Sequence, residues 1–139
     1  MFDLLTGYEW EFLLKLLLAL VFGYAIGVER ELRGKVAGIS THCFVIGGAM
    51  LFTFISGIME PLAPARIAAQ IVSGIGFLGA GIILKGEGQK ITNLTTAASI
   101  WFAAAIGMAI GFGWYFIAII ATLYAVFVPR IPHLKGTKE

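Results

Sequence analysis

The sequence predicts an all-α integral membrane protein, a bundle of five transmembrane helices. Of its 139 residues 59% are hydrophobic and 13% charged, and the mean hydropathy is +0.92. A soluble domain has about a quarter of its residues charged, so lipid suits this chain better than water. Five apolar runs approach the roughly 20 residues that cross a hydrocarbon core. The length fits one domain, residues 1–139.

The five expected helices follow from these runs, and they cover about 12–28, 38–58, 67–84, 94–112 and 114–128. The last two cannot be one helix, because residues 94–128 would be roughly 50 Å long against a core of about 30 Å. The Gly111-Phe112-Gly113 stretch allows a tight reversal there. Pro129 ends the fifth helix.

The basic residues predict the orientation. On one side of a five-helix bundle lie eight of the ten: Arg30, Arg33, Lys35, Lys85, Lys90, Arg130, Lys135 and Lys138. Only Lys15 and Arg66 lie on the other side. By the positive-inside rule the N-terminus is outside and the C-terminus is cytoplasmic. A positive leader region is missing before the first run, so we expect that run to be retained as a helix.

Several classes of protein are disfavoured. A formal net charge of +2 without a basic stripe argues against nucleic acid. The single cysteine, Cys43, cannot form an intrachain disulfide or a cysteine-based zinc site. No nucleophile–base pair is apparent, so we expect neither an enzyme nor a cofactor. Acidic residues fall at membrane edges or in loops, and a metal site stays undetermined.

Ionisable and polar groups near a bilayer invite a functional interpretation. The candidate functional set is Glu29, Arg30, Arg66, Gln70, Ser73, Thr95 and Thr96. Helical rise places the outer and inner halves of this set close enough to form one polar route near the midplane. The alternatives are a charged anchor at the end of the first helix and polar groups that satisfy one another across a dry interface.

Small residues form stripes on several helices, which is typical of tight helix contacts in lipid. We expect six glycines at helix–helix or subunit contacts: Gly23, Gly27, Gly74, Gly79, Gly107 and Gly111. The stripes on the second, third and fourth helices predict that these three pack most tightly. Lys15, in the outer turn of the first helix, can snorkel toward the headgroups.

Several segments resemble the MgtC/SapB family of bacterial inner-membrane proteins. They are Gly23–Gly27 with Glu29-Arg30-Glu31, Ala37-Gly38 before Thr41-His42, Arg66–Gly81 and Leu94–Trp101. The resemblance covers most of the chain, and the Arg66–Gly81 run is specific. It implies a five-helix domain in the bacterial inner membrane, linked to growth in low magnesium, acid stress and survival inside macrophages.

The resemblance also bears on partners and on departures from the family. The virulence member is similar to a regulator of the F-type ATP synthase, which makes that enzyme an expected partner. Ser40 stands where many members have arginine, and Thr95 where the virulence member has asparagine. The chain ends shortly after the fifth helix, so functions that need the family's soluble C-terminal domain are not expected here.

Two functions remain open. The first is a regulator that binds another membrane protein through its helix faces, and the many small-residue stripes favour it. The second is an oligomeric transporter or channel for Mg²⁺ or another small solute, with a path among the second to fourth helices. A homo-oligomer in the bilayer is expected for either function. Magnesium prefers carboxylate oxygens, and none is expected in mid-bilayer.

Overall fold

The first helix extends beyond its apolar run. The structure is a computed structural model that describes residues 6–83 and 92–132, and within these ranges it is helical without strands. Helix α1 spans Glu9–Leu32, whereas about 12–28 was expected. Its last turn therefore carries Glu29 and Arg30 on a helix. Gly34, with φ +64°, follows in the left-handed region and turns the chain back.

Helices α2 and α3 come next along the chain. Helix α2 spans Ile39–Met59 and α3 spans Ala65–Ile83. The start of α2 is tied to the end of α1, because Ile39 N–H donates to Glu31 Oε1 at 2.9 Å. This bond satisfies one of the backbone donors that a helix leaves free in its first turn.

Helices α4 and α5 are separated where the two glycines predicted a break. Helix α4 spans Leu94–Gly111, and α5 spans Tyr115–Phe127 before the short 3₁₀ helix η1 at Val128–Arg130. Gly113 has φ +78° in the intervening turn. The 13 residues of α5 rise about 20 Å, so α1 to α4 are the four helices in the described ranges long and apolar enough to cross a membrane.

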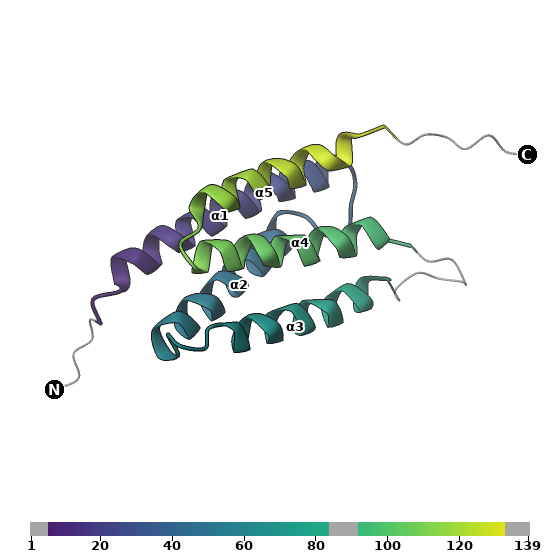
Figure 1. Cartoon of the computed structure of the whole chain (residues 1–139). Coiled ribbons are helices and arrows are strands. Elements are labelled where there is room, and N and C mark those ends of the chain that lie inside the picture. The colour runs from purple at the N-terminus through teal and green to yellow at the C-terminus, as the bar shows by residue number, and fades with distance from the viewer. Residues whose placement is uncertain (1–5, 84–91, 133–139) are drawn as a thin grey trace, which may run out of the picture.

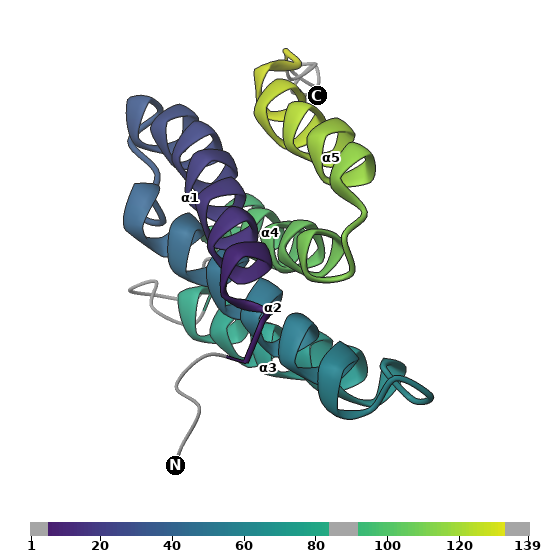
Figure 2. The same ribbon diagram turned by 90° about the vertical axis from the view of Figure 1, so that its left-hand side faces the viewer.

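Helices α2 and α4 form the middle of the bundle. Figure 2 shows α1 and α5 on one side of them and α3 on the other, and Figure 1 shows α3 along the opposite edge from α1 and α5. In α3 only Ile75 and Gly79 are buried, against ten residues of α4. The expectation that the third helix belongs to the tightest packing is therefore wrong. The tight contacts join α2 to α1 and to α4.

The centre of the bundle is apolar. Fully buried side chains from α2 and α4 meet those of α1 there, namely Ile26, Ile46, Met50, Ala103, Ile106 and Ile110. The outer faces are apolar as well, since many large side chains such as Phe44, Phe77 and Phe116 are exposed. Soluble proteins seldom expose such wide apolar surfaces, whereas helices in lipid do.

Candidate functional site

Two glycines bring α1 and α2 into backbone contact. A Cβ atom at Gly23 would lie 2.6 Å from Cys43 Cα, and one at Gly27 would lie 2.3 Å from Ile39 Cα. Only glycine permits so close an approach, which is how small residues hold helices together in lipid. The contact presses the start of α2 against the last turns of α1, which carry Arg30.

Arg30 is buried at the junction of α1 and α4. Its side chain is 1% exposed, and Nη2 donates to Thr96 Oγ1 at 3.3 Å. Its Nε and Nη1 atoms are buried and have no hydrogen-bond partner among the described residues. A guanidinium has five N–H donors, so this one is far from satisfied.

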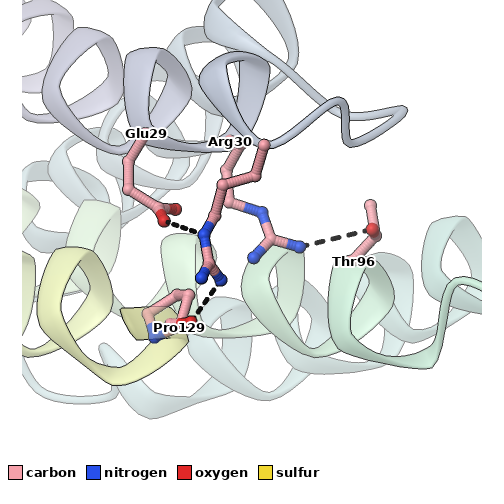
Figure 3. Close-up of polar contacts among 5 residues, drawn as sticks. Glu29, Arg30, Thr96 and Pro129 are labelled. Atoms are coloured by element: carbon pink, nitrogen blue, oxygen red, sulfur yellow. Dashed lines mark hydrogen bonds and ion pairs between the residues drawn. The ribbon is translucent and has the colours of Figure 1, made fainter. Parts of the chain in front are cut away.

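Glu29 points to a different neighbour. Its Oε1 lies 3.1 Å from Arg33 Nε, and Arg33 Nη1 donates to the carbonyl oxygen of Pro129 in η1. Figure 3 shows the Glu29 carboxylate and the Arg30 guanidinium diverging from α1, the first toward the Pro129 side and the second toward Thr96. The Arg33 side chain thus joins the end of α1 to η1, which follows α5, and Glu29 Oε2 has no hydrogen-bond partner among the described residues.

His42 and Ser99 extend the same polar region. The fully buried His42 donates from Nδ1 to the Gly38 carbonyl oxygen, 2.8 Å away, and its Nε2 lies 3.3 Å from Ser99 Oγ. Ser99 Oγ is also 2.8 Å from the Thr96 carbonyl oxygen. We call the whole group the Arg30 cluster: Glu29, Arg30, Arg33, His42, Thr96 and Ser99.

The candidate functional set predicted from the sequence included three of these six residues, Glu29, Arg30 and Thr96. Arg33, His42 and Ser99 were outside it, although the sequence held a signal for each. Arg33 is four residues after Glu29, the spacing at which an ion pair forms on one helix face. His42 is four residues before the buried Ile46, and Ser99 is three after Thr96, so each lies on a buried stripe of its helix.

A second buried polar group lies near the opposite end of the bundle. Lys15 Nζ donates to the carbonyl oxygen of Gly111, the last residue of α4, at 2.8 Å. It also pairs with Glu11 at 2.7 Å and lies 4.7 Å from the centroid of the Phe54 ring. The ammonium therefore turns inward instead of snorkelling, and it complements the negative end of the α4 dipole. Nearby on α2, the buried Thr53 and Ser56 hydroxyls have no hydrogen-bond partner within the described ranges.

An apolar layer separates these two polar groups. His42 and Thr53 are eleven positions apart, about 16 Å along α2. Between them Ile46 and Met50 are fully buried, and they pack in one core cluster with Ile106 of α4. Such a layer leaves little room for water between the two polar ends.

The α3 members of the predicted set lie elsewhere. Arg66 is exposed and pairs with Glu60 at 3.3 Å, and Gln70 and Ser73 are exposed as well. These residues lie about 140° to 180° around α3 from its buried residue Ile75, so the packing of α3 turns them away from the bundle. The structure does not bring them to Glu29, Arg30 and Thr96, and Thr95 is also exposed.

The side chain of Gln70 instead lines a groove between α2 and α3. The groove has a volume of about 410 Å³ and is apolar apart from this one side chain. Its walls come from both helices and its floor includes one residue of α4: Phe44, Val45, Gly48, Ala49, Phe52, Ile67, Gln70, Ile71, Gly74, Ile75, Leu78 and Ala104. A Cβ atom at Gly74 would have nothing within 4 Å in the described part of the chain, so Gly74 makes no close helix contact there.

The glycines of α4 lie against α2. A Cβ at Gly107 would be 2.3 Å from the Ile46 carbonyl oxygen, and one at Gly111 would be 2.5 Å from Thr53 Cβ. Gly79 of α3 is looser, since its Cβ would make an ordinary contact of 3.7 Å with Ala97 Cβ. Four of the six predicted packing glycines thus lie at the closest helix approaches.

These features define a multi-pass helical membrane protein in which buried charges hold helix ends together around an apolar centre. In the described ranges, no three histidine, cysteine, aspartate or glutamate side chains converge as a metal site would require. The chain belongs to the MgtC family, whose model matches residues 16–133.

Three relatives illustrate the similarity. The chain is 45% identical over 132 residues to the "Putative magnesium transporter YhiD" of Escherichia coli, with 88% of this chain and 61% of that protein covered. It is 46% identical over 112 residues to the protein MgtC of Salmonella typhimurium, covering 81% and 48%. An uncharacterized protein of Haemophilus influenzae is 42% identical over 130 residues, covering 86% and 55%.

The chain thus spans about half to three fifths of the length of these relatives. No solved structure matches it.

Proposed function

We propose that this protein supports adaptation to magnesium limitation or related stress by binding another membrane protein through its helix faces. The name of one relative points to magnesium, since the Escherichia coli protein is described as a putative magnesium transporter. The F-type ATP synthase is the candidate partner, on the family resemblance alone. The proposed location is the bacterial inner membrane.

The observation that carries this proposal is the filled interior of the bundle. Ile46, Met50 and Ile106 occupy the space between the two buried polar groups, and each has no exposed surface. A solute path along the bundle axis would have to displace this layer. Helix α3 leaves most of its surface unburied, with Val72, Phe77 and Leu78 exposed. Such a surface suits contacts with another helix.

We also propose five membrane crossings with the N-terminus outside. The end of α1 contacts the start of α4 through Arg30 and Thr96, and the end of α5 through Arg33 and Pro129. These contacts support an alternating arrangement in which all three ends share one membrane face. α5 is short, but α5 and η1 together form an apolar segment from Tyr115 to Arg130.

Orientation is testable by labelling from either side of sealed cells. In a Cys43→Ala background, Thr6→Cys should react with an impermeant maleimide added outside. Lys35→Cys should react only after permeabilisation. Both wild-type positions are exposed. Labelling of both from the same side would contradict an odd number of crossings between them, and the reverse pattern would contradict the orientation.

One observation favours an oligomeric transporter as the second candidate. Gln70 is exposed in the apolar groove, and a polar side chain in lipid needs a partner or water. A path lined by Gln70 and Ser73 would have to run between copies of the chain, because both side chains face away from the centre of the protomer.

A paired experiment separates the two functions. A strain lacking the protein's gene is grown in low magnesium with wild-type protein, Gly74→Leu or the control Gly57→Leu, and membrane levels are measured. Both glycines have open space for a side chain, but only Gly74 lines the groove. Loss of growth from Gly74→Leu alone would show that the groove is needed, for either function. Magnesium uptake by proteoliposomes of the wild-type protein would then establish the transporter, and its absence would support contact with a partner.

A further inference from the structure

The Arg30 cluster contains more positive charge than it neutralises. Arg30 and Arg33 are both charged, whereas Glu29 is the cluster's one carboxylate, and its ion pair is with Arg33. Arg30 is left with the neutral Thr96 hydroxyl as its described partner. A buried charge is stable only when a counter-charge and hydrogen bonds compensate for the lost water.

The start of α4 adds to this excess. Arg30 contacts Thr96 in the first turn of α4, the positive end of the helix dipole. Asn93, the residue before the helix, has φ +62° and makes no side-chain capping bond. The Arg30 guanidinium, whose Nε and Nη1 are unpaired among the described residues, therefore contacts a helix N-terminus whose free N–H groups also favour an anion.

We infer that Arg30, with Arg33 and the first turn of α4, binds a phosphate group. Its source is a lipid headgroup or free inorganic phosphate. Water could accept bonds from the unpaired donors, but it would not neutralise the charge. A phosphate does both, because it presents several anionic oxygens to guanidinium donors.

The cluster meets its surroundings on the side of Arg33. Arg33 is 41% exposed, so it is the member that an anion meets first. Arg130 is exposed near the end of α5. Basic side chains at a membrane face attract anionic headgroups. The inference does not depend on which face this is, or on the proposed regulatory function.

The test uses the full chain in dodecyl maltoside, a detergent without phosphate. Thermal unfolding is followed in three titrations: sodium phosphate against sodium chloride of equal ionic strength, phosphatidylglycerol, and a galactolipid that carries neither charge nor phosphate. We expect the unfolding midpoint to rise with a phosphate-bearing ligand and not with the galactolipid. A response to phosphatidylglycerol alone identifies a headgroup, and a response to sodium phosphate identifies free phosphate.

Three variants show whether a response belongs to Arg30. Arg30→Gln should raise the apparent Kd by about tenfold or more, because charge-assisted hydrogen bonds are lost. Arg33→Gln should also weaken binding, because it frees Glu29 to neutralise Arg30. Lys35→Gln removes the same charge from an exposed position and should bind as the wild type does.

Two results would overturn the inference. One is no stabilisation of the wild type by either phosphate source, in which case water alone satisfies the donors. The other is an equal response in Arg33→Gln and Lys35→Gln, which would indicate general charge attraction. Because Arg33 is partly exposed and its variant is expected to fold, this comparison decides the matter even if Arg30→Gln does not fold.

Discussion

Replacing Gly107 or Gly74 by alanine should change the stability of the protein in opposite directions. Both glycines lie within helices, so alanine relieves a helix-propensity penalty of about 1 kcal/mol at either site. What differs is the space around them. A Cβ at Gly74 has nothing within 4 Å, whereas one at Gly107 would be 2.3 Å from the Ile46 carbonyl oxygen and 2.8 Å from Ala49 Cβ.

The magnitude at Gly107 follows from these distances. An ordinary Cβ contact is 3.4 Å or more, so α2 and α4 would have to separate by about 1 Å. Overpacking of this kind destabilises a core by about 1–3 kcal/mol, which exceeds the gain in propensity. We therefore expect Gly107→Ala to lose up to about 2 kcal/mol, and Gly74→Ala to gain up to about 1 kcal/mol.

The assay is reversible unfolding in mixed micelles of dodecyl maltoside and sodium dodecyl sulfate, followed by far-ultraviolet circular dichroism. Gly76→Ala serves as a matched control, since it is also open on α3. The packing argument would be refuted if Gly107→Ala were as stable as Gly74→Ala. It would also fail if all three variants shifted the free energy of unfolding by the same amount.

Two further predictions concern the buried charges. Thr96→Val removes the described partner of Arg30 and should lower the free energy of unfolding by about 1–3 kcal/mol, whereas Thr96→Ser should retain most of the wild-type stability. Unfolding in mixed micelles tests this difference, and equal stability of the two variants would contradict the prediction. Lys15→Ala removes the hydrogen bond to the Gly111 carbonyl oxygen and should lower the unfolding temperature. Glu11→Gln, at the half-exposed end of the ion pair, should change the free energy of unfolding by less than about 1 kcal/mol. A larger loss from Glu11→Gln than from Lys15→Ala would show that the ion pair matters more than the bond to Gly111.

The sequence by itself was sufficient for the order and approximate position of the helices and for the turn between α4 and α5. Apolar length and hydropathy set where a chain can cross lipid, and a run from Leu94 to Val128 is too long for one crossing. The glycines at 111 and 113 then marked the break, which the structure has between Gly111 and Tyr115. The family was also recognisable from local motifs, because these need no knowledge of packing.

The candidate site was only partly accessible from the sequence. Glu29, Arg30 and Thr96 were selected because charged and polar groups at the ends of apolar runs are unusual. Their proximity to Arg66, Gln70 and Ser73 was inferred from depth in the membrane. Depth, however, does not determine the direction in which a residue faces around its helix.

That direction is what only the tertiary structure decided. A side chain facing lipid and one facing another helix are equally apolar, so hydropathy alone does not separate the inside of a membrane bundle from its outside. Gly107 and Gly74 look alike in the sequence, yet one meets a backbone oxygen and the other an open groove. Likewise Arg30 is buried and Arg66 exposed, because the crossing of α1, α2 and α4 encloses one helix end and leaves α3 at the edge.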